Sequence, residues 1–338
     1  DGESREARKE TALILITGGL GYVGSHAMRY LREQGRDVLA FDNLIYGHTE
    51  AACGAPYVIG DLMNTDDLRK VFRENEIDSV MHFAAFAAVG ESVAHPKKYY
   101  DNNIRGGLNL LEAMLEADVK RFVFSSTCAI FGEPVEIPMA ETHPVAPANP
   151  YGETKLAFER VLKWYGRAYG LKSACLRYFN AAGAHPSGEI GEDHEPERHL
   201  IPLAIRAAAG TGDALTVFGS DYDTPDGTCI RDYIHVTDLA QAHLLTLQQM
   251  ENGGDSAAYN LGNGNGYSVL EVIQCVERIT GHPVPHAFGD RRPGDPGRLV
   301  GSSKKAMDEL GWRPEFDSLE AIVETAWRWH ESHPKGYR

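Results

Sequence analysis

Short apolar runs alternate with longer amphipathic stretches along the first half of the chain. Such runs are typical of strands that are buried on both faces of a parallel sheet, and helical spacing between them is typical of the covering helices. Helical spacing after the first run begins at about Ser25. The predicted strands are 12–17, 38–41, 57–59, 79–83, 122–124 and 173–178. The alternation predicts an α/β fold with a doubly wound parallel sheet of the Rossmann type.

The pattern loosens after residue 178, where Gly, Pro, Asp and His crowd the segment 181–199. We therefore expect a sheet domain at 12–180 and a smaller mixed α/β domain at 181–338. An apolar run at 259–262 predicts that about 233–262 return to the first sheet. The charged residues 1–11 are expected to form a disordered leader.

Composition narrows the classes of function. The 338-residue chain carries a formal charge of −15 at pH 7, which opposes binding to nucleic-acid backbones. No apolar run approaches the roughly 20 residues that span a bilayer, so a soluble protein with no membrane partner is expected. Five scattered cysteines without CxxC spacing predict neither a disulfide framework nor a metal site, and reduced thiols favour a cytoplasmic location.

A glycine-rich turn between the first strand and the first helix carries G-x-x-G-x-x-G at Gly18, Gly21 and Gly24. This turn lets the backbone approach a pyrophosphate at a helix N-terminus, although a glycine turn without a ligand is the alternative. Asp42 follows Gly24 by 18 residues, where a carboxylate accepts the ribose hydroxyls of NAD and repels the 2′-phosphate of NADP. Asp61 is a weaker candidate for the adenine end, with loop capping as the alternative.

Tyr151 and Lys155 form Y-x-x-x-K at helical spacing, which places the phenol and the ammonium on one face of a helix. A free tyrosine has a pKa near 10, so a nearby lysine and a cationic nicotinamide would favour the phenolate, which serves as a base. Thr127, at a strand end, can bridge a substrate hydroxyl and Tyr151. A surface Tyr–Lys pair and strand-end capping are the alternatives. Catalysis is favoured because the pair follows both the strand of the glycine-rich fingerprint and a strand that ends in Ser and Thr.

These motifs resemble the extended short-chain dehydrogenase/reductase family, and from about Leu13 onward the chain is similar to its UDP-glucose (UDP-galactose) 4-epimerases. The matching segments are TGGLGYVGSH (17–26), DNL (42–44), HFAA (82–85), VGES (89–92), YYDNN (99–103), NPYGETK (149–155), LRYFNAAGAHPSG (176–188), DGTCIRDYIHVTDLA (226–240) and RRPGD (291–295). The resemblance implies an NAD-binding first domain, a nucleotide-sugar-binding second domain, a UDP-sugar substrate and a homodimer.

The resemblance also implies roles for single residues. The catalytic set is Thr127, Tyr151 and Lys155. The residues implied for NAD are Gly18, Gly21, Tyr22, Val23, Gly24, Asp42, Asn43, Asp61, Leu62, Phe83, Ala84, Ala85, Asn102, Tyr151, Lys155 and Tyr178. Those implied for the UDP-sugar are Thr127, Tyr151, Asn180, His199, Leu200, Val217, Phe218, Arg231, Arg292, Asp295 and Leu299. Arginine suits the diphosphate because its planar donors bind phosphate in pairs. No metal is expected.

Four positions depart from the pattern of some family members. Ala87 replaces a lysine that contacts the cofactor, His199 replaces an asparagine, Thr127 replaces the commoner serine, and Leu299 replaces a tyrosine at the edge of the sugar. The smaller Leu299 leaves room for an N-acetyl group.

The implied reaction is reversible 4-epimerisation of a UDP-hexose through a 4-keto sugar, with Tyr151 as base. UDP-N-acetylhexosamines and UDP-pentoses stay open as substrates. A nucleotide-sugar dehydratase is less favoured, because Cys128 and Ala129 stand where dehydratases carry an acid pair. A non-catalytic NAD sensor is also less favoured, because sensing requires no base.

Overall fold

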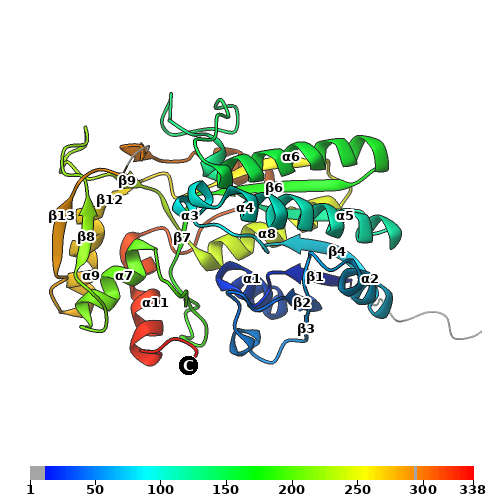
Figure 1. The fold of residues 1–338 in the computed structure, drawn as a ribbon, viewed down its shortest axis with the longest axis horizontal. Coiled ribbons are helices and arrows are strands. Elements are labelled where there is room, and N and C mark those ends of the chain that lie inside the picture. Colours follow the sequence, from blue (N-terminus) through cyan, green and yellow to red (C-terminus); the bar gives the residue numbers. More distant parts are fainter. Residues whose placement is uncertain (1–11, 293–294) are drawn as a thin grey trace, which may run out of the picture.

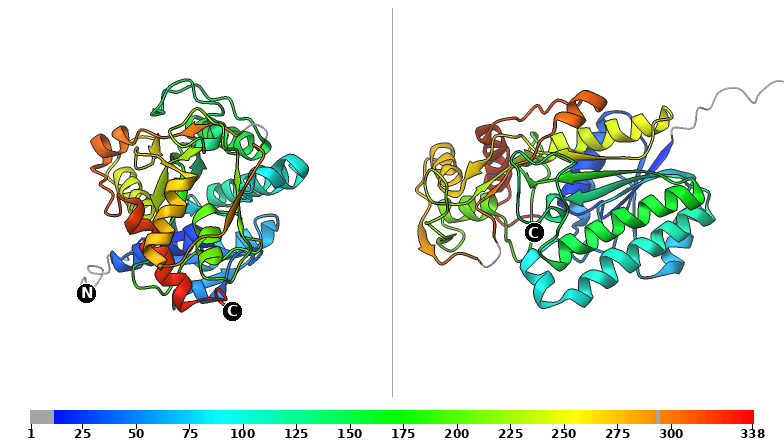
Figure 2. Two further views of the ribbon diagram at one scale, coloured as in Figure 1. Left: turned by 90° about the vertical axis from the view of Figure 1, so that its left-hand side faces the viewer. Right: turned by 90° about the horizontal axis from the view of Figure 1, so that it is seen from above.

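The computed structural model describes residues 12–292 and 295–338, so the leader expected at 1–11 lies outside the described residues. A seven-stranded sheet forms the larger part of the molecule, and a smaller domain lies at one end (Figures 1 and 2). The strand order of the seven-stranded sheet is β11-β6-β5-β4-β1-β2-β3, and neighbouring strands run parallel. The strands are β1 (Leu13–Thr17), β2 (Val38–Asp42), β3 (Tyr57–Ile59), β4 (Ile77–His82), β5 (Arg121–Thr127), β6 (Lys172–Tyr178) and β11 (Ala257–Leu261). The predicted doubly wound parallel sheet is confirmed.

Helices cover both faces of this sheet (Figure 1). One face carries α1 (Tyr22–Glu33), α8 (Val236–Glu251) and α10 (Lys304–Leu310); the other carries α2 (Thr65–Glu74), α5 (Gly107–Glu116) and α6 (Pro150–Tyr169). Ile14 and Ile16 of β1 belong to the first core and Leu15 to the second. The core divides in this way because successive strand side chains point to opposite faces.

Most predicted strand ends differ from the structure by one or two residues, and two boundaries differ by three. Helix α1 begins at Tyr22 rather than near Ser25, because its first turn serves the glycine-rich loop and lacks apolar spacing. Strand β5 continues beyond residue 124 to Thr127, because Ser125, Ser126 and Thr127 are buried and paired with β6 despite their polar side chains.

The smaller domain packs three helices around its own apolar core: α7 (Leu200–Ala208), α9 (Val269–Thr280) and α11 (Leu319–Ser332). Strands β8 (Leu215–Phe218) and β13 (His286–Gly289) pair beside them, and β9 (Ile230–Arg231) lies between β12 (Tyr267–Ser268) and β14 (Arg298–Leu299). Strand β7 (Asn180–Ala182) pairs with β10 (Tyr233–His235). The chain therefore passes from the carboxyl end of β6 almost directly into this domain.

Short elements complete the described fold. They are η1 (Thr49–Ala52), α3 (Val89–Ala94), α4 (Pro96–Tyr99), η2 (Tyr100–Gly106) and η3 (Cys128–Ile130).

Later parts of the chain return to the large sheet. Strand β11 adds beside β6, and α8 packs on α1, where sequence analysis places a return of about 233–262. Trp312 is also buried in the first core and donates its indole N–H to Asp238 O at 3.0 Å. Among the described residues, no helix is both long and apolar enough to cross a membrane.

Candidate active site

Of the three glycines of the G-x-x-G-x-x-G pattern, packing requires two and leaves room at the third. Gly18 has a φ of +70°, and a Cβ there would lie 2.5 Å from the amide nitrogen of Ala84. A Cβ on Gly24 would lie 2.1 Å from the carbonyl oxygen of Gly18. A Cβ on Gly21 would meet only that same oxygen, at 3.4 Å. Gly21 is the N-cap of α1 and offers no side-chain cap, so this helix N-terminus suits a dinucleotide pyrophosphate.

Asp42 ties the end of β2 to this turn. Its carboxylate accepts hydrogen bonds from the amides of Leu20 at 3.0 Å and Leu44 at 2.8 Å, and burial raises its pKa. Both carboxylate oxygens thus have one backbone partner beside the turn. Because each carboxylate oxygen can accept a further bond, the position suits the ribose acceptor expected there.

The neighbouring residues predicted for the adenine end form a small polar contact. Asn43 donates to Asp61 at 3.1 Å, and the other Asp61 oxygen accepts from the amide of Met63 at 2.8 Å. The loop contact that sequence analysis gives as the alternative for Asp61 is therefore present. Leu62 beside it is buried in the core under α5.

The loop after β4 closes against β1. The amides of Phe83 and Ala84 donate to the carbonyl of Thr17 at 2.9 and 3.1 Å, and Ala85 follows in the same loop. Farther along this loop, Ala87 is exposed. On α1, Tyr22 is buried and donates to Gly183 O at 2.6 Å, while Val23 packs on the core.

Helix α6 positions Tyr151 and Lys155, the residues predicted to be catalytic, at the carboxyl end of β5. Asn149 caps the helix by accepting from the amide of Gly152 at 2.9 Å, and proline occupies the first helical position. A Cβ on Gly152 would lie 2.4 Å from Ala129 O, so the helix approaches the end of β5 closely. Tyr151 in this first turn lies beside Thr127, which ends β5. The predicted Thr–Tyr neighbours thus meet in space.

Lys155 is buried one turn after Tyr151, and its Nζ donates to the carbonyl of Ser125 at 2.7 Å. Burial lowers the pKa of Lys155 to about 7 and raises the pKa of Tyr151 above its usual 10, while the neighbouring Thr127 side chain opposes the rise. Burial therefore disfavours the Tyr151 phenolate in the protein by itself, and the expected phenolate depends on the positive charges of both Lys155 and the nicotinamide. A further positive charge is needed at the tyrosine.

A polar network holds α6 against β5 and β6. Glu159 of α6 accepts from Arg177 of β6 at 2.6 and 3.0 Å and from Ser126 of β5 at 2.6 Å. Tyr178 shares a hydrogen bond with Ser125, and burial raises its pKa to about 12. The network joins α6, β5 and β6 at the catalytic end of the sheet.

The residues predicted for the UDP-sugar come together in pairs from the smaller domain. Arg231 forms an ion pair with Asp295, and the guanidinium of Arg292 lies 4.0 Å from the ring centroid of Phe218. Val217 is buried next to Phe218 in β8. The predicted arginines thus occupy two separate arrangements, and of these Arg231 is paired with a carboxylate.

Leu299 of β14 lies opposite Arg231 of β9, and it packs with Cys128 against the cluster of apolar residues beside η3. Leu299 and the residue that follows Thr127 thus border the same apolar cluster. Asn180 donates its side-chain amide to Asp232 O at 2.9 Å. Leu200 begins α7, away from these contacts, and is preceded by the exposed His199.

Two supporting residues are missed by sequence reasoning. Buried Asp232 accepts from the amides of Asn263 at 2.7 Å, Gly264 at 3.0 Å and Gly301 at 3.1 Å, and burial raises its pKa to about 6. These partners lie 31 to 69 positions away, so no local pattern predicts them.

The second is Asn103, which exchanges two hydrogen bonds with the backbone of Phe86 at 3.0 Å each. It also accepts from the side chain of Asn102 at 3.0 Å. The YYDNN motif marks this position, and its tandem asparagines are the signal that sequence analysis leaves unused for Asn103.

A glycine-rich turn at a helix N-terminus, together with Thr127, Tyr151 and Lys155 at the carboxyl end of the same sheet, defines a dinucleotide-dependent enzyme of the short-chain dehydrogenase/reductase class. The chain belongs to the NAD dependent epimerase/dehydratase family, which matches residues 14–262. The family confirms the predicted fold class and the predicted NAD dependence.

Individual relatives agree over nearly the whole chain. A UDP-glucose 4-epimerase of Halalkalibacterium halodurans is 53% identical over 324 residues, which cover 96% of this chain and 97% of that protein. The crystal structure of UDP-glucose 4-epimerase from Brucella ovis in complex with NAD is 46% identical, with a TM-score of 0.91 and coverage of 94% and 97%. The enzyme from Bifidobacterium longum in complex with NAD+ and UDP is 39% identical, with a TM-score of 0.92 and coverage of 96% and 100%.

Proposed function

We propose that this chain interconverts UDP-glucose and UDP-galactose by reversible 4-epimerisation through a 4-keto sugar. The observation that carries the proposal is the proximity of Tyr151, in the first turn of α6, to Thr127 at the end of β5, with Lys155 buried one turn later. Similarity to enzymes named UDP-glucose 4-epimerase supports the choice of substrate.

Tyr151 is the base that takes the proton of the sugar 4′-hydroxyl, and Thr127 bridges the two oxygens. When bound, NAD supplies the acceptor and later the donor of the carbon-bound hydrogen, together with a positive charge. Lys155, on the same face of α6, supplies a positive charge that favours the Tyr151 phenolate. These groups lower the cost of the phenolate that burial alone disfavours.

Inversion requires that the planar keto-sugar presents both of its faces to one catalytic set. Arg231 and Arg292 would hold the diphosphate, and Phe218 would stack with the uracil, so that the sugar turns about a fixed anchor. Asp295 would accept from the uridine ribose, and Asn180 would contact the phosphates or the sugar. Anchoring at the UDP end leaves rotation of the hexose free.

The remaining residues of the two predicted sets keep their assignments in this proposal. The glycine turn, Asp42 and the loop after β4 would bind NAD, and His199 and Leu200 would border the nucleotide. In this proposal the first domain would bind NAD and the second would bind the nucleotide sugar.

We also propose a cytoplasmic homodimer. Five unpaired cysteines suit a reducing compartment. Large apolar side chains are exposed on α3 and α6 at Val93, Trp164 and Tyr169, as a helical dimer interface would require. Sedimentation of wild type and Trp164→Glu tests the dimer: a monomeric variant is expected, and a monomeric wild type would contradict the proposal.

The test of activity is conversion of UDP-galactose by purified protein with NAD present, followed by coupled oxidation of the UDP-glucose formed. Tyr151→Phe should lower kcat by about 10²–10⁴-fold, the usual contribution of a general base. The matched control is Tyr169→Phe, because Tyr169 is an exposed phenol at the far end of the same helix. Absence of conversion by wild type, or equal rates in both variants, would contradict the proposal.

A further inference from the structure

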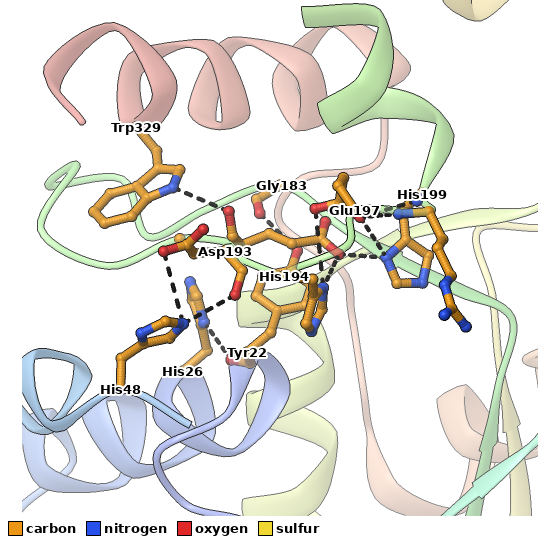
Figure 3. Close-up of polar contacts among 12 residues, drawn as sticks. Tyr22, His26, His48, Gly183, Asp193, His194, Glu197, His199 and Trp329 are labelled. Carbon is orange, nitrogen blue, oxygen red and sulfur yellow. Dashed lines mark hydrogen bonds and ion pairs between the residues drawn. The ribbon is translucent and has the colours of Figure 1, made fainter. Parts of the chain in front are cut away.

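The segment between β7 and α7 carries a cluster of four side chains that the proposed reaction does not use as a unit. Glu192, His194, Glu197 and His199 each offer one nitrogen or oxygen atom, and these atoms all lie within 4.8 Å of one another. Figure 3 shows His194, Glu197 and His199 pointing toward one another beside Tyr22. Cysteine spacing, on which the prediction of no metal rests, does not test a site built from histidine and glutamate.

The distances within the cluster are on the scale of a coordination site, with the carboxylate of Glu197 reaching one histidine through each of its oxygens. His194 Nδ1 lies 3.1 Å from Glu192 Oε1 and 3.9 Å from Glu197 Oε2, and His199 Nδ1 lies 3.3 Å from Glu197 Oε1. Bonds of about 2.0–2.1 Å in a tetrahedron place ligand atoms about 3.4 Å apart. His199 Nδ1 and Glu192 Oε1, now 2.5 Å apart, would separate by somewhat under 1 Å.

Burial supplies an independent observation. The carboxylates of Glu192 and Glu197 are 4% and 1% exposed, and Glu197 Oε2 is buried without a hydrogen-bond partner among the described residues. A buried carboxylate oxygen without a partner is costly. This oxygen is directed toward His194 Nδ1, so the unsatisfied acceptor faces the centre of the cluster.

We propose that Glu192, His194, Glu197 and His199 bind one divalent transition-metal ion, with zinc as the best fit. Imidazole nitrogen and carboxylate oxygen are both zinc ligands, and two carboxylates balance the charge of the ion. Four protein ligands close a tetrahedral site, so the ion is structural. The alternative is a metal-free network in which protonated His199 forms ion pairs with the two glutamates.

The ion would fix a segment that connects both predicted binding regions. The Tyr22 ring meets that of His194 edge to face at 6.2 Å, and the Tyr22 hydroxyl donates to Gly183 O. Trp329 of α11 donates to Glu192 O at 3.2 Å. The cluster therefore lies between the first turn of α1, at the cofactor site, and the helices of the smaller domain (Figure 3).

The test uses full-length protein without a histidine tag, stripped with a chelator and titrated with zinc chloride against a chromophoric zinc indicator. We expect one tight equivalent per chain. Glu197→Gln and His194→Ala should each weaken zinc binding by more than about 100-fold, beyond the 10–100-fold effect of outer-shell partners. The matched controls are Glu189→Gln and His185→Ala, which change the same residue types in the same segment outside the cluster, and they should bind zinc like wild type.

Zinc bound equally by all four variants would show an adventitious ion at other side chains and would overturn the proposal. A second measurement does not depend on the folding of any variant: an anomalous difference map at the zinc edge, from wild-type crystals grown with zinc chloride. A peak bounded by the four side chains supports the site. A map without that peak overturns it in favour of the metal-free ion pairs.

Discussion

Glu159 offers the sharpest test of how the catalytic helix is held. Its carboxylate accepts three hydrogen bonds, two from Arg177 and one from Ser126, and the two ionic side chains are only 9% and 11% exposed. Glu159→Gln leaves the Arg177 guanidinium buried without a counter-charge. Removing one partner of a buried pair costs about 3–5 kcal/mol, and we expect about 3 kcal/mol because glutamine keeps one acceptor oxygen.

The same substitution should change the pH dependence of catalysis. The charge of Glu159 raises the pKa of Lys155 against the larger lowering by burial, so its removal lowers that pKa below about 7. If Lys155 acts as an ammonium, activity declines as pH rises through its pKa. The alkaline fall of kcat/KM should therefore begin at a lower pH in Glu159→Gln than in wild type.

Urea unfolding gives the change in free energy, and a pH series of initial rates gives the shift. The control is the double variant Glu159→Leu/Arg177→Met, which removes both charges and should be close to wild type in stability, since apolar replacement of a whole buried pair is often neutral. A loss below about 1 kcal/mol in the single variant, or an equal loss in the double variant, would refute the reasoning.

Three further predictions concern other parts of the site. Asp232 has a pKa of about 6 in the fold against 3.8 when free, so the folded state holds its proton more tightly and stability should fall by roughly 2 kcal/mol as pH rises from 4 to 6; Asp232→Asn should flatten that slope in urea unfolding measured across this range, and an unchanged slope would contradict the assignment. Gly21→Ala should weaken NAD binding, measured by fluorescence titration, with stability within about 0.5 kcal/mol of wild type, whereas Gly24→Ala should also cost about 1–3 kcal/mol, since its Cβ meets backbone at 2.1 Å; equal stability of the two variants would argue against these separate roles. Leu299→Tyr should reduce conversion of a UDP-N-acetylhexosamine at least about tenfold while sparing UDP-glucose in a substrate panel; equal loss on both substrates would remove Leu299 as a size gate.

The order of strands and helices follows from local pattern, and so could be predicted. Buried parallel strands require continuous apolar runs, and the turn between β1 and α1 requires glycine at Gly18 because of its positive φ. The spacing of Tyr151 and Lys155 places them on one helix face wherever that helix packs. Each of these conclusions depends on residues within a few positions of one another.

Boundaries were harder to predict because polar residues near the site extend the strands and helices beyond the positions that the apolar pattern marks. Thr127 lies within β5 because its neighbours bond across to β6, and Tyr22 lies within α1 because Gly21 begins the helix. The direction of the Tyr151 pKa also needed the tertiary structure, because the sequence does not show how far packing removes the phenol from solvent.

The sequence by itself determined the fold class, the cofactor turn and the catalytic spacing, since each is encoded by short-range periodicity or by residues with special backbone freedom. Only the tertiary structure decided which distant groups meet, such as Arg231 with Asp295 and Asp232 with two later loops. It also decided that Glu192 and the histidines of its own irregular segment fold back on one another. The physical reason is that these contacts depend on how loops without periodicity pack on the domains, and burial then sets the charge that each side chain can carry.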